Sequence, residues 1–231
     1  MEKVWLQTKD NKKIAGLYYE TDNPKGWVIY LHMMPAAKES WNKLAEELSK
    51  KGYTGIAIDF RGHGESDGGP DGYKDFSDSE HGAAINDIEA ADKFLEKKGV
   101  KKGKGIVVGA SIGANLALQY ITSHLEYTIG VLLSPGINYH GVDTITAAEK
   151  MPPQDRLMFV SSEDDVGNTD QVKKITHSLP DGVYNKEIVY KTAGHGTNMF
   201  KTGEDPNLLE ALVSFAESIS PASSPEKLTE K

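Results

Sequence analysis

Short apolar runs alternate with amphipathic segments along almost the whole chain. The runs at 27–32 and 53–60 are nearly continuous, as expected of strands that are buried on both faces of a sheet. Between them, Trp41, Leu44 and Leu48 recur at the spacing of one helical face. This alternation predicts an α/β fold with right-handed strand–helix–strand crossovers and a mostly parallel central sheet flanked by helices on both faces.

About eight strands are expected from these patterns, and the first two read as an antiparallel pair because they alternate apolar and polar residues. The predicted strands are residues 4–8, 14–20, 27–32, 53–60, 105–108, 128–134, 157–161 and 187–191. The predicted helices are residues 39–51, 78–98, 114–120, 169–179 and 206–219.

All of these elements are assigned to one domain over residues 1–219. The segment between Pro135 and the strand at 157 is too short for an inserted lid, so no separate cap domain is expected. Residues 220–231, rich in serine and proline and then in charge, are expected to form a flexible C-terminal tail.

The sequence Gly-Ala-Ser-Ile-Gly at residues 109–113 lies between a predicted strand and a predicted helix. A serine at such a corner is forced onto a sharp bend that holds its Oγ above the edge of the sheet. Gly109 and Gly113 are required because side chains there would collide with the neighbouring strand and helix. We therefore predict that Ser111 is a nucleophile in a nucleophile elbow.

A second Gly-x-Ser-x-Gly match surrounds Ser66, at residues 64–68. It follows a turn-like segment and precedes a stretch of glycine and proline at 68–72, where no helix can start. Because only Ser111 has a strand before it and a helix after it, Ser66 is not expected to act as a nucleophile.

A serine nucleophile needs a base, and seven histidines compete for that role. His195 follows the last predicted strand, and the small residues on both sides of it leave the imidazole free to reach inward. We predict that His195 is the base. The other histidines are expected to have no catalytic role. We expect His63 to form hydrogen bonds in a turn and His32 to support a loop. Surface positions are expected for His81, His124, His140 and His177.

The acid that orients the base is expected after the strand at 157–161, where three carboxylates follow one another. Their place between Ser111 and His195 is the chain order that this geometry requires. Asp165 is the predicted acid and Asp164 is the alternative. Glu163 is assigned to the solvated surface of the loop.

Acyl transfer also needs two backbone N–H groups aimed at the developing oxyanion. Ile112, directly after the nucleophile, is expected to supply one, and the start of its helix adds a favourable dipole. The second is expected from the loop after the strand at 27–32, from Met34, with Met33 as the alternative. The methionine side chains either fill the core or line an acyl pocket.

Composition excludes several other chemistries. The 231-residue chain has no cysteine and therefore no disulfide framework, Cys-based zinc site or cysteine nucleophile. Its 34 acidic and 26 basic residues argue against non-specific binding to nucleic acid or anionic membranes. No run approaches the ~18 apolar residues of a membrane span, and the first residues lack the apolar core of a signal peptide. We expect a cytoplasmic protein.

Four blocks of the chain resemble the α/β-hydrolase superfamily. Residues 31–35, Leu-His-Met-Met-Pro, are similar to the His-Gly-x-x oxyanion loop. Residues 59–66, Asp-Phe-Arg-Gly-His-Gly-Glu-Ser, resemble the superfamily's D-x-R-G-H-G-x-S turn. The elbow at Ser111 is the third block, and the loops of Asp165 and His195 form the fourth.

The size of the chain and the lack of a lid resemble the compact carboxylesterases and the dienelactone-hydrolase-like group. Two departures stand out. Met33 replaces the usual glycine after the loop histidine, and its side chain narrows the entrance to the site. True dienelactone hydrolases use a cysteine nucleophile, which this chain lacks.

The resemblance implies a serine hydrolase that cleaves carboxylic esters through Ser111, His195, Asp165 and an acyl-enzyme intermediate. A short- to medium-chain acyl group is expected, because no lid builds a long tunnel. A thioesterase, amidase or peptidase would use the same triad, as would a perhydrolase or haloperoxidase-like enzyme; a non-catalytic hydrolase-like binding protein would lose triad members. The expected partner is a small-molecule ester. No cofactor, metal, nucleic acid or membrane span is predicted, and the oligomeric state stays open between monomer and dimer.

Overall fold

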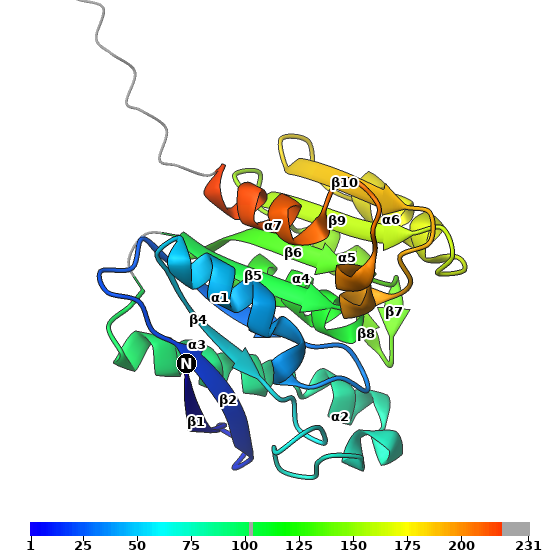
Figure 1. The fold of residues 1–231 in the computed structure, drawn as a ribbon. Helices are drawn as coiled ribbons and strands as arrows, with labels where there is room; N and C mark the ends of the chain where they lie inside the picture. Colours follow the sequence, from blue (N-terminus) through cyan, green and yellow to red (C-terminus); the bar gives the residue numbers. More distant parts are fainter. Residues whose placement is uncertain (102–103, 219–231) are drawn as a thin grey trace, which may run out of the picture.

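The computed structural model describes residues 1–101 and 104–218. Within this part of the chain, eight strands form one sheet in the order β1–β2–β4–β3–β5–β6–β9–β10 (Figure 1). β2 pairs antiparallel with β1 and β4, and every other pairing in this sheet is parallel. The mostly parallel α/β sheet is therefore confirmed. Its strands are β1 (Glu2–Gln7), β2 (Lys13–Tyr19), β3 (Gly26–Leu31), β4 (Tyr53–Ile58), β5 (Lys104–Ala110), β6 (Tyr127–Leu133), β9 (Arg156–Ser162) and β10 (Tyr184–Tyr190).

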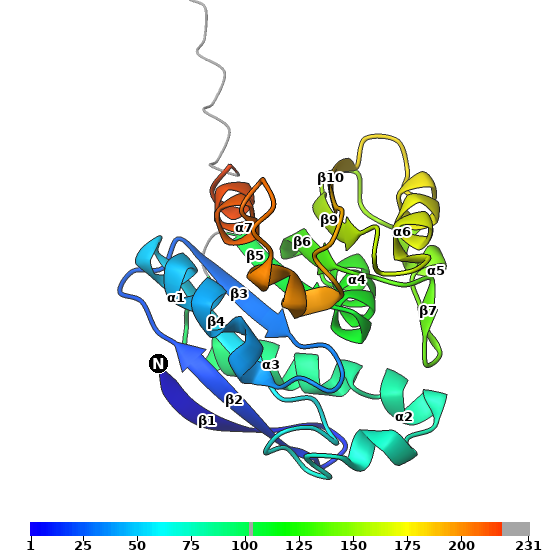
Figure 2. The same ribbon diagram turned by 45° about the vertical axis from the view of Figure 1, so that its right-hand side comes forward.

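Helices cover both faces of the sheet (Figures 1 and 2). Residues of α1 and α7 share one core cluster with Val28 and Tyr30, whereas residues of α3, α4 and α6 share the other with Ile29 and Leu31. Successive residues of β3 thus enter opposite cores, as the pleat of a doubly covered strand requires. The helices on the faces are α1 (Asn42–Lys50), α3 (Ile85–Lys97), α4 (Ile112–Ser123), α6 (Asn168–His177) and α7 (Leu208–Glu217).

The predicted helix over 78–98 is in fact two helices, α2 (Asp78–Gly82) and α3. Ser77 begins α2 with a capping box, in which its hydroxyl accepts from the Glu80 N–H and the Glu80 side chain accepts from the Ser77 N–H. Ala83 and Ala84 separate the two helices. Helical periodicity continues across the break, so the sequence pattern conceals it.

The segment between β6 and β9 contains a small hairpin, β7 (Asn138–Tyr139) and β8 (Val142–Asp143), and the one-turn helix α5 (Ile145–Ala148). His140 and Gly141 both have positive φ, 49° and 78°, as a two-residue hairpin turn demands. Strands of two residues are too short to leave a periodic pattern, so this hairpin was not predicted. In the described part of the chain no separate cap domain is present.

Three 3₁₀ segments complete the described elements: η1 (Lys38–Trp41), η2 (Gly72–Asp75) and η3 (Gly196–Lys201). Over residues 1–101 and 104–218, no helix has both the length and the apolar character needed to cross a membrane. The predicted tail at 220–231, and the last residue of the predicted domain, Ile219, lie outside the described residues.

Candidate active site

The bend between β5 and α4 places Ser111 in a strained conformation, with φ 53° and ψ −122°. A Cβ on Gly109 would lie 2.2 Å from the Gly113 carbonyl oxygen, and a Cβ on Gly113 would lie 2.5 Å from the Leu31 carbonyl oxygen. Both positions therefore exclude any residue with a side chain. The Ser111 N–H donates to the Leu133 carbonyl at 2.8 Å, which ties the bend to the end of β6. The strain is local and coincides with a half-buried hydroxyl, as in a nucleophile elbow.

His195 and Asp165 form a close pair, with 2.6 Å between His195 Nδ1 and Asp165 Oδ2. Asp165 follows β9 and His195 follows β10, and the two strands are parallel neighbours. Their carboxyl ends therefore open onto the same edge of the sheet. Both side chains are partly exposed, His195 at 33% and Asp165 at 20%, so the pair is accessible from solvent.

Asp164, the alternative acid, points to a different partner. Its Oδ1 accepts from the Gly194 N–H at 3.0 Å and from the Ser162 hydroxyl. These hydrogen bonds, the one from Ser162 foremost, lower the pKa of the Asp164 carboxyl. Asp164 thus holds the backbone of the loop that carries His195, and the exposed Glu163 side chain is turned to solvent as expected.

Two buried serines hold the same loop from either side. The Ser162 hydroxyl accepts from the Ala193 N–H at 2.9 Å, and the Ser134 hydroxyl accepts from the Gly196 N–H at 2.9 Å. Ser134 directly follows β6 and has a φ of 48°. With Asp164, these side chains supply acceptors for three N–H groups around His195. The loop is therefore fixed by the ends of β6 and β9.

The structure brings the loop of His195 against the elbow. A Cβ on Gly196 would lie 3.5 Å from the Ala110 Cβ, so the residue after His195 contacts the residue before Ser111. The hydrogen bonds of residues 1–101 and 104–218 include none between Ser111 and His195. Catalytic hydrogen bonds without substrate are commonly long, so the shared location is the informative observation.

His32 supports the loop that carries Met33 and Met34. The Phe60 N–H donates to His32 Nε2 at 3.0 Å, so the proton of the neutral ring lies on Nδ1, which donates to the Met33 carbonyl at 2.9 Å. Burial, followed by the neighbouring His63, lowers the pKa of His32 to about 4 and keeps it neutral. His32 therefore has the supporting role predicted for it.

The residues predicted to supply the two oxyanion donors lie near one another. Met34 and Ile112 line one small pocket, and the Leu31 and His32 carbonyls press against Gly113 in the first turn of α4. Ile112 is the first residue of α4, so its N–H has no partner within the helix. Met33, the alternative donor, is buried against Gly196 and uses its carbonyl to accept from the Ala36 N–H.

A buried ion pair next to the predicted oxyanion loop, the loop after β3, was not predicted from the sequence. Asp59 accepts from the Lys38 N–H at 2.8 Å and from Lys38 Nζ at 2.7 Å, and it also accepts from the Glu65 N–H at 2.9 Å. Lys38 and Asp59 are 1% and 0% exposed. This pair fastens the end of the oxyanion loop to the turn after β4. The only sequence signal for it was Asp59, in the block that resembles the superfamily's turn.

The second Gly-x-Ser-x-Gly serine is structural. Ser66 is buried, its hydroxyl donates to the Asp59 carbonyl at 2.7 Å, and it accepts from the Ala15 N–H at 2.9 Å. It joins β2 to the turn after β4. His81, in contrast, departs from its predicted surface position: it is 5% exposed and packs on Phe76 and His140.

Comparisons with known proteins agree with this geometry. The family model described as alpha/beta hydrolase fold matches residues 26–126. The AB hydrolase superfamily protein YisY of Bacillus subtilis is 28% identical over 97 residues, which is 42% of this chain and 32% of that protein. The match thus spans about a third of the relative's length.

Two solved structures resemble the whole described fold. The Pyrococcus furiosus esterase Pf2001 superposes with a TM-score of 0.77 at 20% identity, covering 94% of this chain and 91% of its own. A dienelactone hydrolase from Anabaena variabilis superposes with a TM-score of 0.70 at 15% identity, covering 94% of each chain. Together with the sheet order, the family model over residues 26–126 and these structures show that the chain has the α/β-hydrolase fold.

Proposed function

We propose that this protein is a serine hydrolase of carboxylic esters, with Ser111 as nucleophile, His195 as base and Asp165 as the acid that orients the base. The observation that carries the proposal is the 2.6 Å pair of His195 and Asp165 at the sheet edge where the strained elbow presents Ser111. This contact favours a catalytic role for His195 over that of a solvent-exposed loop residue.

In the proposed acylation step, His195 Nε2 takes the Ser111 proton as Oγ forms a bond to the ester carbonyl carbon. The electron pair of the carbonyl moves to its oxygen, which the N–H groups of Ile112 and Met34 stabilise. The tetrahedral intermediate then collapses, the bond to the alcohol oxygen breaks, and the imidazolium returns its proton to the leaving alcohol. Asp165 keeps the His195 proton on Nδ1 and stabilises the imidazolium charge.

Deacylation repeats these steps with water. His195 removes a proton from the water molecule as it attacks the acyl-enzyme, and Ser111 leaves as the alcohol when the acid is released. The proposed reaction steps require no cofactor and no metal. The domain proposed to carry them out is residues 1–219, in a protein that we propose to be cytoplasmic.

A structural neighbour favours ester hydrolysis over the related reactions. Pf2001 is described as an esterase, and its structure covers 94% of this chain. At 20% identity the likeness transfers no substrate, so it supports only the class of reaction.

The test is turnover of p-nitrophenyl acetate and p-nitrophenyl butyrate by the wild type, Ser111→Ala and Ser66→Ala. Ser111→Ala should lose essentially all turnover, and an organophosphonate should label only the wild type and Ser66→Ala, at Ser111. Ser66→Ala removes two buried hydrogen bonds and should lower stability by about 1–3 kcal/mol while the folded enzyme stays active. Ester turnover that survives Ser111→Ala would exclude the proposal.

A further inference from the structure

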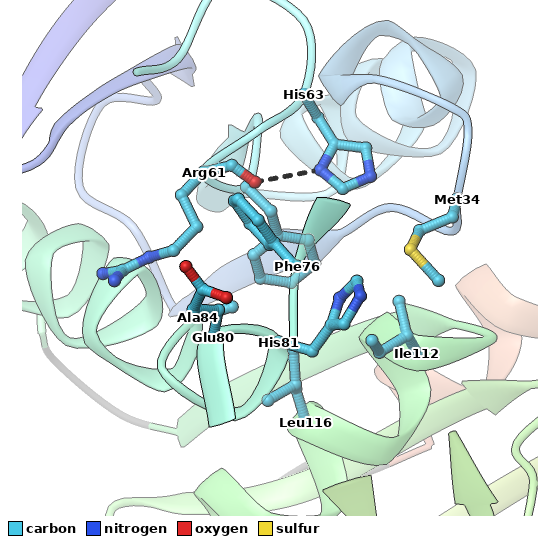
Figure 3. Close-up of a pocket in the computed structure, with 10 residues that line it drawn as sticks. Met34, Arg61, His63, Phe76, Glu80, His81, Ala84, Ile112 and Leu116 are labelled. Carbon is cyan, nitrogen blue, oxygen red and sulfur yellow. Dashed lines mark hydrogen bonds between the residues drawn. The ribbon is translucent and has the colours of Figure 1, made fainter. Parts of the chain in front are cut away.

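A small pocket is lined by the two residues proposed to supply the oxyanion donors (Figure 3). Met34 and Ile112, which supply those donors, both line it, and Leu116 continues the wall one turn further along α4. The pocket has a volume of about 10 Å³. That is the space of about one water molecule, and hence of about one methyl group.

The pocket lies on the acyl side of the proposed reaction. The leaving alcohol must be within reach of His195, because His195 returns the proton to it. The lining residues come from the loops after β3 and β4, from the loop before α2, from α2, from the link between α2 and α3, and from α4. None comes from the loops of His195 or Asp165. The group that enters this pocket is therefore the one that stays on Ser111.

The lining offers no charge to a polar acyl group. The Arg61 guanidinium turns away from the pocket and binds Asp87 and Asp10, while its carbonyl accepts from His63 (Figure 3). The Glu80 carboxylate is used by the N–H and hydroxyl of Ser77. What remains is largely apolar or aromatic surface, which suits an alkyl group, together with the uncharged imidazoles of His63 and His81; His63 Nε2 is buried without a hydrogen-bond partner among the described residues.

His81 forms part of the pocket wall. Its ring lies across from Ile112, and it packs edge-on against Phe76 with ring centroids 5.5 Å apart (Figure 3). On its other side, the ring of His140 from the β7–β8 hairpin lies 4.4 Å away, centroid to centroid. The capping box at Ser77 fixes α2, so His81 is held in place from three directions.

Resting on the proposed hydrolase function, we infer that the enzyme selects acetyl esters and that His81 is the residue that excludes longer acyl chains. The acetyl methyl fills the pocket, whereas a butyryl chain would have to displace His81 or Phe76. Hydrophobic pockets discriminate a single methylene by roughly 10- to 200-fold when the chain does not fit, so the expected preference is large enough to measure.

The experiment measures kcat/KM for p-nitrophenyl acetate and p-nitrophenyl butyrate in the wild type, His81→Ala, Phe76→Ala and His177→Ala. The wild type should prefer acetate by about tenfold or more. His81→Ala and Phe76→Ala should each bring the ratio close to one by raising turnover of butyrate. His177, an exposed histidine on α6, is the matched control, and its variant should keep the wild-type ratio.

A wild type that cleaves butyrate as fast as acetate overturns the inference, as does an unchanged ratio in both enlarged variants once thermal unfolding shows them folded. The inference is also overturned if these variants change their preference for the alcohol group, measured with ethyl and phenyl acetate, and not their preference for the acyl group. Should His81→Ala fail to fold, Phe76→Ala decides, because Phe76 is half-buried in a loop. In each of these cases Ser111→Ala still abolishes turnover and the proposed function stands. If the wild type cleaves no ester at all, both this inference and the proposed function are excluded.

Discussion

At the scale of single residues, two adjacent carboxylates have different partners. Asp165 faces His195 Nδ1, whereas Asp164 binds the Gly194 N–H and the Ser162 hydroxyl through one oxygen, Oδ1. Asp165→Asn replaces an acceptor by an amide that can stabilise the wrong tautomer of His195, so we expect kcat to fall by about 10⁴. Asp164→Asn keeps an oxygen at the position of Oδ1, so we expect kcat to fall by less than about tenfold.

Steady-state kinetics on an acetate ester, with circular dichroism to establish folding, compares the two variants directly. They differ by one position in the same loop and by the same chemical change, so each controls for the other. A larger loss in Asp164→Asn than in Asp165→Asn would reverse the assignment of the acid.

The geometry of a candidate catalytic residue could be predicted from the sequence where a turn forces it. Ser111 was predicted because glycines at 109 and 113 leave room for one backbone path only. His195 and Asp165 were predicted as triad members from chain order, and the structure places them in contact; their catalytic roles stay predictions. Ser134 and Ser162 were not predicted, because a buried serine that binds a distant N–H leaves no local pattern in the sequence.

At the scale of elements, the loop from Ala193 to Gly196 depends on the ends of two strands. Ser134 after β6 and Ser162 at the end of β9 each accept from one of its N–H groups. Ser134→Ala leaves the Gly196 N–H without its acceptor, and we expect a loss of about 1–3 kcal/mol in stability. Because His195 is then less well held, kcat should fall by about tenfold or more while KM changes little.

Ser123→Ala is the control for that prediction, because Ser123 is exposed at the end of α4 and its hydroxyl bonds only within the helix. A Ser134→Ala variant that loses stability and keeps the wild-type kcat would mean that Ser134 supports the fold but does not position His195. Kinetics below the unfolding temperature separate the two effects.

Elements were predictable where their apolar pattern is long. All eight strands of the sheet were predicted, and the differences in their ends are a few residues. The break between α2 and α3 was missed, because the apolar residues 85, 88 and 91 continue the helical spacing. The β7–β8 hairpin was missed because strands of two residues leave no periodic pattern in the sequence.

At the scale of the whole molecule, the mostly parallel sheet and its two covered faces followed from the alternation of strands and helices, because right-handed crossovers leave few topologies open. The order of the strands was not predicted. The buried ion pairs did not follow. Lys38 with Asp59, and Arg61 with Asp87, join segments 21 and 26 positions apart in the chain. Nothing in a single sequence states which of its many charged residues will be buried together, because burial is decided by the packing of the complete fold.

Stability of the complete fold should depend on pH through His32, which joins the end of β3 to Phe60 after β4. Its pKa is about 4 in the folded protein, against about 6.5 in an unfolded chain. Between these values the unfolded state binds a proton that the folded state excludes, so this contribution is fully present above pH 6.5 and is lost as pH falls toward 4. The full difference corresponds to a loss on the order of 3 kcal/mol.

His32→Asn retains a side-chain donor for the Met33 carbonyl and does not titrate, so it should be less stable than the wild type at pH 7.5 and should lose less stability on acidification. Urea unfolding at pH 7.5, 6, 5 and 4.5 gives the free energy of unfolding at each pH for both proteins. The His63 pKa is also lowered, chiefly by burial, so a residual slope of the same sign should survive in His32→Asn. Double replacement with His63→Asn should flatten it further. Parallel curves for wild type and His32→Asn would contradict the prediction, because they would place the titration that weakens the fold in groups other than this buried imidazole.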